Sequence, residues 1–151
     1  MNISELDIKL NGIDENGVEK EYKISDFSGE NTIIYFYPKD NTSGCTQEAC
    51  DFQENKNRWA AKARVVGVSP DSIKSHKNFQ EKHGLNFILL SDSEHQLAEK
   101  LGAWGEKSMY GKKYMGIIRS TFLFDEKGEC KKEWRKVKVK GHVDEVLEAL
   151  E

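Results

Sequence analysis

The feature that most constrains the fold is an alternation between short apolar runs and longer segments with helical spacing. The runs are rich in β-branched and aromatic residues, as buried strands are, and they cover residues 31–37, 64–69, 87–90 and 117–124. Helices are predicted over 70–83, 94–101 and 142–150. A further helix is predicted from Cys45 onward, because apolar residues recur at helical intervals: Ala49, Phe52, Trp59, Ala60 and Ala63. This order predicts an α/β fold, a three-layer sandwich around a central mixed β-sheet.

The two ends of the chain modify this plan. Residues 8–10 and 18–22 flank an Asn16-Gly17 turn, which predicts an N-terminal β-hairpin. Residues 119–139 predict strands joined by a tight turn, which add antiparallel pairing, while 102–116 is expected to be a loop. With 151 residues and no linker or repeat, the chain is expected to form a single domain, 1–151.

The segment after the first long strand contains the candidate chemistry. Pro38 cannot donate to a sheet and ends the strand, and a polar stretch then leads to Cys45 at a predicted helix start. Unpaired N–H groups and the positive end of the helix dipole favour a thiolate there, and the thiolate is the nucleophilic form. A free cysteine is equally often a small buried apolar side chain. Position alone leaves both interpretations open.

Cys50 stands five residues after Cys45. On an intact helix, residues five apart are separated by about 8.6 Å between Cα atoms. A disulfide needs Cα atoms within about 7 Å. A bond between these two cysteines therefore requires the first turns of the helix to unwind.

The segment from Pro38 to Cys45 resembles the peroxiredoxin active-site pattern P-x-x-x-T/S-x-x-C. With residues 48–52 behind it, the chain is similar to the bacterioferritin comigratory protein, or Q-type, group. The similarity extends over most of the chain, to residues 67–72, 90–92, 119–123 and 137–143. Two departures stand out: Ser43 replaces the usual proline before Gly-Cys, and the usual Ala-Pro-Asp-Phe-like N-terminal segment is absent. The resemblance implies a thioredoxin-like fold and the reduction of hydrogen peroxide and organic hydroperoxides.

The resemblance also implies roles for individual residues. Cys45 would be the peroxidatic thiolate, which becomes a sulfenic acid, and Cys50 would be the resolving thiol of an intramolecular Cys45–Cys50 disulfide. The other catalytic groups would be Thr42, which holds the thiolate and the peroxide, and Arg119, which stabilises charge on both. Supporting roles would belong to Pro38, which shields the thiolate, to the Gly44 backbone N–H, and to Glu48, which orients Arg119. The implied reductant is thioredoxin, with glutaredoxin as the other dithiol donor, and no cofactor or metal is required.

Each supporting residue also has a simpler explanation. Thr42 is a common type of N-cap, Pro38 ends a strand, and acids such as Glu48 collect in helix first turns. Arg119, in an otherwise apolar run, is costly unless paired, so a structural ion pair is the alternative to a site role. Cys130 has no partner nearby in the sequence and is expected to be a bystander. The four histidines, 76, 83, 95 and 142, show no ligand spacing, so no metal site is expected.

Composition limits the remaining partners. The formal net charge is −3, no apolar stretch approaches the length of a membrane span, and the N-terminus lacks signal-peptide features. We therefore expect a protein that binds neither nucleic acid nor membrane. Three cysteines without secretory features favour the cytoplasm and reduced thiols. Resolution within one subunit would need no partner, so a monomer is expected. Two alternatives to a peroxidase are a thioredoxin-like disulfide exchanger and a non-enzymatic redox sensor or holdase. An exchanger normally has a C-x-x-C motif, whereas four residues separate the cysteines here.

Overall fold

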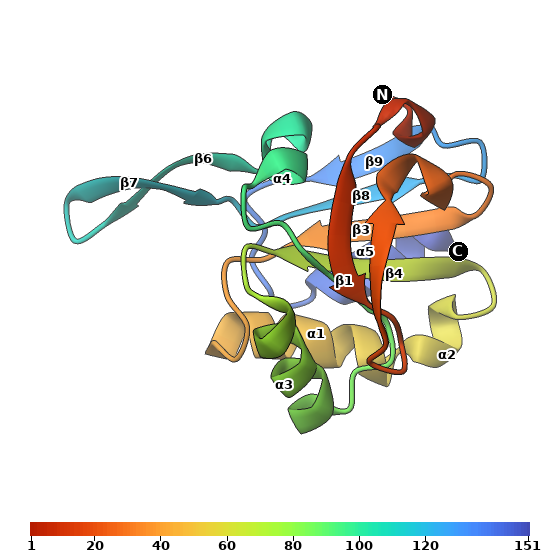
Figure 1. The fold of residues 1–151 in the computed structure, drawn as a ribbon, viewed down its shortest axis with the longest axis horizontal. Helices are drawn as coiled ribbons and strands as arrows, with labels where there is room; N and C mark the ends of the chain where they lie inside the picture. The colour runs from red at the N-terminus through yellow and green to blue at the C-terminus, as the bar shows by residue number, and fades with distance from the viewer.

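The computed structural model of the protein describes residues 1–151 and contains a seven-stranded mixed sheet (Figure 1). The strand order is β2-β1-β5-β4-β3-β8-β9. The central strands β3, β4 and β5 are parallel, and every other pairing in this sheet is antiparallel. The strands are β1 (Lys9–Ile13), β2 (Glu19–Lys23), β3 (Asn31–Phe36), β4 (Ala63–Ser69), β5 (Ile88–Ser91), β8 (Ser120–Phe124) and β9 (Cys130–Trp134). The predicted mixed sheet and N-terminal hairpin are both confirmed.

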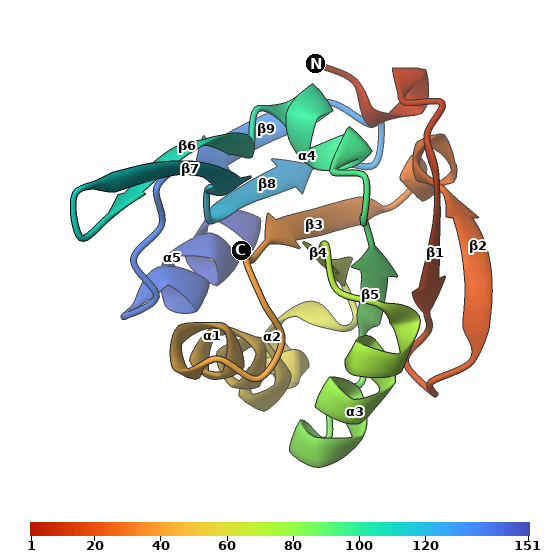
Figure 2. The ribbon, with the colours of Figure 1, turned by 60° about the vertical axis from the view of Figure 1, so that its left-hand side comes forward.

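Helices cover both faces of the sheet and make the three layers visible in Figure 2. The helices are α1 (Ser43–Glu54), α2 (Lys56–Trp59), α3 (Ile73–His83), α4 (Gln96–Leu101) and α5 (His142–Leu150), with short 3-10 turns η1 (Ile3–Glu5) and η2 (Ile24–Phe27). One apolar cluster joins the sheet to α1, α2, α3 and α5, and a second joins the other face to η1, η2 and α4. Alternate residues of β3 divide between the clusters: Ile33 and Tyr35 enter the first, and Ile34 and Phe36 enter the second. None of the helices has the length and apolar character needed to cross a membrane.

The helix predicted from Cys45 to Ala63 is wrong in its second half. α1 ends at Glu54, α2 is a separate short helix, and Ala63 is already the first residue of β4. The indole N–H of Trp59 donates to the carbonyl of Phe52 at 2.9 Å, the acceptor that a continuing helix would offer to the amide of Lys56. The apolar spacing continued because α2 packs Trp59 into the same core as α1.

The predicted loop 102–116 is also wrong. It contains a second two-stranded sheet, β6 (Trp104–Met109) paired with β7 (Lys112–Ile117), which projects from the body (Figures 1 and 2). Tyr110 and Gly111 both have positive φ, as the tight hairpin turn requires. Because the strands project away from the core, they lack the apolar alternation of a half-buried strand.

The last strands begin and end differently from the prediction. Arg119 lies between β7 and β8 rather than inside a strand, and β9 ends at Trp134. The remaining residues up to 139 cross to α5 without regular structure. Their path passes the start of α1, because a Cβ placed on Gly44 would lie 3.8 Å from Val139.

Candidate active site

Cys45 lies in the first turn of α1, which follows the carboxyl end of β3. Its side chain is buried, 1% exposed. The N–H groups of Gly44 and Cys45 have no acceptor within the helix, and neither donates to any other protein group. A buried sulfur at a helix start with free N–H groups has the surroundings that favour a thiolate.

Arg119 connects Cys45 to a carboxylate one turn later on the same helix. Its Nη2 donates to Sγ of Cys45 at 3.1 Å, and its Nη1 donates to Oε1 of Glu48 at 2.7 Å. The Glu48 side chain is fully buried and that of Arg119 is 16% exposed. The planar guanidinium therefore spans nucleophile and carboxylate, and both its orientation and its charge are fixed by buried partners.

Burial and ion pairing act in opposite directions on the pKa values of Glu48 and Arg119. Burial raises the pKa of Glu48 to about 7, although Arg119 beside it favours the carboxylate. Burial acts to lower the pKa of Arg119, but Glu48 and Cys45 outweigh it, so the pKa of the guanidinium is raised. Arg119 therefore stays charged, while Glu48 changes charge near neutral pH.

Cys50 lies on the same helix and is half-buried, and both thiols are free. Burial raises the pKa of the Cys50 thiol, and the nearby acids Glu54 and Asp51 act in the same direction. Because both cysteines lie on one intact helix, the distance argument from the sequence applies to the folded protein. The reduced fold keeps the two sulfurs apart and keeps Cys50 protonated.

Thr42 and Pro38 lie on the loop that leads into α1. Thr42 occupies the N-cap position, but its hydroxyl donates to the carbonyl of Lys39 at 2.8 Å and makes no capping bond. Its role as a side-chain N-cap is therefore wrong, and its oxygen lone pairs are available to a ligand. Pro38 is half-buried and lies two residues after the end of β3.

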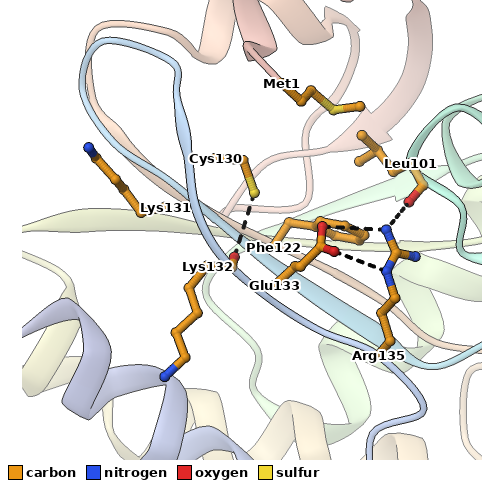
Figure 3. A pocket seen from close by; sticks show the side chains of 8 residues that line it. All are labelled: Met1, Leu101, Phe122, Cys130, Lys131, Lys132, Glu133 and Arg135. Atoms are coloured by element: carbon orange, nitrogen blue, oxygen red, sulfur yellow. Dashed lines mark hydrogen bonds and ion pairs between the residues drawn. The ribbon is translucent and has the colours of Figure 1, made fainter.

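Cys130 lies outside this cluster, at the start of β9. It lines a separate pocket of about 400 Å³ (Figure 3), and the residues around that pocket are Met1, Leu101, Phe122, Lys131, Lys132, Glu133 and Arg135. Its thiol is 3.7 Å from the carbonyl of Lys132, and burial raises its pKa. Arg135 binds the Leu101 carbonyl and Glu133 instead of the sulfur. The structure does not bring Cys130 to the other two cysteines.

Two residues near the site received no role from the sequence. His142, at the start of α5, lies with Nε2 2.8 Å from Oγ1 of Thr121 and 4.0 Å from Oε2 of Glu48. Burial lowers the pKa of His142 to about 4, so the ring is neutral near pH 7. Burial also lowers the pKa of Lys107 on β6, and Arg119 acts in the same direction. The resemblance over residues 137–143 was the available signal for His142, but nothing in the sequence linked Lys107 to the site.

Comparisons with known proteins identify the family of the chain. Residues 5–133 match the model of the AhpC/TSA family. The chain is 55% identical to peroxiredoxin Bcp of Bacillus subtilis over 85% of this chain and 82% of that protein, and 49% identical to peroxiredoxin Bcp of Xanthomonas campestris over 82% and 78%. It resembles the structure of the Xanthomonas campestris bacterioferritin comigratory protein, studied for alkyl peroxide reduction, with a TM-score of 0.88 and 42% identity over 96% of this chain and 90% of that one.

Proposed function

The chain belongs to the AhpC/TSA family and is a peroxiredoxin, a thiol-dependent peroxidase, and from this premise we propose that Cys45 is the peroxidatic residue. The observation that carries this assignment is the 3.1 Å contact between Nη2 of Arg119 and Sγ of Cys45 in a buried first helical turn. Neither of the other cysteines has a cationic donor on its sulfur.

In the first step, the Cys45 thiolate attacks the terminal oxygen of R–O–O–H. The sulfur–oxygen bond forms as the oxygen–oxygen bond breaks, and the departing oxygen takes the bonding electron pair. The product RO⁻ acquires a proton from solvent to become alcohol or water, and Cys45 is left as a sulfenic acid. Arg119 and the N–H groups of Gly44 and Cys45 stabilise the negative charge as it moves from sulfur to oxygen. Thr42 accepts the peroxide proton in a hydrogen bond, Glu48 orients Arg119, and Pro38 limits access of water.

In the second step, Cys50 attacks the sulfenic sulfur. A sulfur–sulfur bond forms, the sulfur–oxygen bond breaks, and the departing hydroxide takes up the proton released by the Cys50 thiol and leaves as water. The first turns of α1 unwind to allow this. A thioredoxin- or glutaredoxin-type dithiol then reduces the disulfide. We propose hydrogen peroxide and organic hydroperoxides as substrates, and a monomer acting in the cytoplasm, because both cysteines lie on one chain and need a reducing compartment.

Three serine variants test these assignments. Cys45→Ser is expected to consume no peroxide. Cys50→Ser is expected to undergo one turnover and to gain one oxygen atom by mass spectrometry, trapped by a sulfenic-acid reagent, and then to stall with a thioredoxin-type reductant. Cys130→Ser is the matched control and is expected to retain wild-type turnover. Steady turnover by Cys50→Ser at the wild-type rate would refute the resolving role.

A further inference from the structure

The loop between β3 and α1 is attached to the fold by one buried side chain. Between Tyr37 and Cys45, the only buried residue is Asp40, while Lys39, Asn41, Thr42 and Ser43 are exposed. Asn41 has φ of 62°, a left-handed conformation that asparagine tolerates better than most residues. A short exposed loop with an unfavourable backbone conformation needs an anchor to hold one position, and Asp40 is placed to supply it.

Three side chains form hydrogen bonds with the carboxylate of Asp40. The Tyr37 hydroxyl donates to Oδ1 at 2.6 Å, and the Ser75 hydroxyl donates to Oδ2 at 2.8 Å. Nδ1 of His76 lies 2.7 Å from Oδ2, and neither member of this pair is more than 1% exposed at its side chain. The backbone N–H of Asp40 donates to Oδ2 of Asp71 at 2.8 Å. Asp40 is therefore attached at once to the residue that follows β3, to α3 and to the loop that precedes α3.

The contact of the second ring nitrogen of His76 shows how many protons the Asp40–His76 pair carries. Nε2 lies 2.9 Å from the carbonyl oxygen of Leu90, which can only accept, so Nε2 carries hydrogen. A second proton lies between Nδ1 and Oδ2 of Asp40, because two acceptors at 2.7 Å would repel. With both protons present the pair has no net charge, whichever residue holds the shared one. A pair without net charge costs less to bury than a single unpaired charge.

We infer that Asp40 and His76 are positioning residues for the peroxide reaction and the fixed point from which α1 unwinds. The inference rests on the proposed roles of Cys45 and Cys50. In the reduced protein, the segment from Asn41 to Cys45 is held at both ends. At its start, Asp40 is bonded to His76 of α3, and at its end, Arg119 donates to the sulfur of Cys45. Formation of a neutral sulfenic acid removes the negative charge of Cys45 and weakens its contact with Arg119, while the contacts of Asp40 are unchanged. Unwinding therefore starts at about Ser43, and the loop with Pro38 and Thr42 stays in place to receive α1 again after reduction.

Substitutions at Asp40 and His76 test the positioning role. Asp40→Ala and His76→Leu break the anchor, and we expect the rate constant of Cys45 oxidation to fall about 10- to 100-fold, as small misplacements of reacting groups do. Formation of the Cys45–Cys50 disulfide is expected to be as fast as in wild type or faster. Asp40→Asn is expected to restore the peroxide step to within about 3-fold of wild type, because its amide can donate to Nδ1 of a neutral His76 and accept from Tyr37. Both steps are followed by rapid quenching and mass spectrometry.

Two controls separate positioning from general destabilisation. His83→Ala removes a contact from the same helix to exposed Asn41, at 3.2 Å, and is expected to leave both steps unchanged. Leu97→Ala creates a cavity in the core on the opposite face of the sheet and is expected to lower the melting temperature without changing either step. A wild-type peroxide rate in Asp40→Ala, or failure of Asp40→Asn to restore it, would overturn the positioning role.

Hydrogen exchange on the wild-type protein tests the fixed point without any substitution. In the disulfide form, we expect amides of 46–53, which are hydrogen-bonded in the reduced helix, to lose protection while the amide of Asp40 keeps it. Equal loss of protection at Asp40 would overturn the fixed point. Cys45→Ser is assayed in parallel: peroxide consumption surviving in that variant would refute the proposed function. A wild-type rate in Asp40→Ala beside an inactive Cys45→Ser would refute the present inference alone.

Discussion

Cys45 and Cys50 lie on one helix, five residues apart, in opposite chemical surroundings. Cys45 is buried against the guanidinium of Arg119, at the end of α1 where backbone N–H groups are unpaired. Cys50 is more exposed, has no cationic partner, and has Asp51 and Glu54 nearby, which with burial raise its thiol pKa. Exposure alone would favour Cys50 as the nucleophile. The charge and the N–H donors around a sulfur decide its reactivity, and the more buried of the two thiols is the one equipped to react.

The same contrast favours reaction of the two thiols in the proposed order. A protonated Cys50 is a poor nucleophile toward peroxide, so we expect oxidation to start at Cys45. In the proposed second step, unwinding of α1 would remove Cys50 from its partly buried position and bring the sulfurs within bonding distance. We therefore propose that the intact helix keeps the Cys50 thiol unreactive until the first step is complete.

Removing the guanidinium of Arg119 is expected to have the largest effect on the difference in reactivity between Cys45 and Cys50. Arg119→Ala takes the only cationic donor from Cys45, and the peroxide rate constant is expected to fall about 100- to 1000-fold, the usual loss for one donor to developing charge. Arg119→Lys is expected to recover part of the rate, because a point charge cannot donate to Cys45 and Glu48 with the same planar fork. Stopped-flow measurement of the first turnover gives the rate.

A surface arginine supplies the control for Arg119. Arg58 also pairs with two carboxylates, Asp144 and Glu151, but it lies away from the cysteines, and Arg58→Ala is expected to leave the peroxide step unchanged. If Arg119→Ala stayed within about 3-fold of wild type, the assigned stabilisation of the reacting oxygens would have to be abandoned.

A smaller effect is expected from the carboxylate behind Arg119. The pKa of Glu48 is about 7 in the folded protein against 4.5 for the ordinary side chain. Between these two values the folded protein holds a proton that the unfolded chain has released, so this residue makes stability fall as pH rises from 4.5 to 7. Glu48→Gln removes the titration, and the free energy of unfolding of the variant relative to wild type is expected to increase by about 1 to 3 kcal/mol from pH 5 to pH 8.

The comparison between variant and wild type is needed because His142 acts in the opposite sense. Its folded pKa of about 4 lies below the ordinary 6.5, so its contribution makes stability rise with pH between those values. Urea unfolding of both proteins at several pH values isolates Glu48. A difference that does not vary with pH would mean that Glu48 is already ionised throughout this range.

A structural feature could be predicted from the sequence where the residues that determine it lie close together in the chain. β3 and α3 were predictable because their apolar patterns and the Ser72 N-cap are contained in the segments themselves. Cys45 at a helix start was predictable for the same reason. The hairpin β6–β7 was missed because it projects from the core and so carries no burial pattern.

The contacts that complete the site join distant parts of the chain. Arg119 and Glu48 are 71 residues apart, and Asp40 and His76 are 36 apart. The family resemblance supplied the first pair as an expectation, but no motif or spacing in the sequence indicated that the two side chains of the second pair would meet. Such pairs depend on how α3 packs beside the loop after β3, which propensity and periodicity do not determine.

The smallest expected effect concerns the helix that separates the two cysteines. Gly44 lies in the first turn of α1 with an ordinary backbone conformation, and an added Cβ would make only van der Waals contacts, at 3.4 Å to Arg119 and 3.8 Å to Val139. Alanine favours a helix over glycine by about 0.5 to 1 kcal/mol. Because that stabilisation is lost when the turn unwinds, Gly44→Ala is expected to slow disulfide formation about 2- to 5-fold at equal rates of peroxide attack. A sulfenic acid that waits longer meets more peroxide, so the variant is also expected to reach sulfinic acid at lower peroxide concentrations.

Two measurements make this last prediction decisive. The first-turnover rate of Gly44→Ala shows whether the methyl group has disturbed Arg119, and only a wild-type value there allows the second step to be interpreted as unwinding. Thr46→Ala raises helix propensity two residues further on, at a side chain whose hydroxyl makes no hydrogen bond, and it is also expected to slow resolution. If both variants formed the disulfide at the wild-type rate while their reduced helices were more protected from amide exchange, unwinding of α1 would not limit resolution. Cys50 would then reach Cys45 by a different motion, and the separation of the two thiols on one helix would not control the order of the reaction.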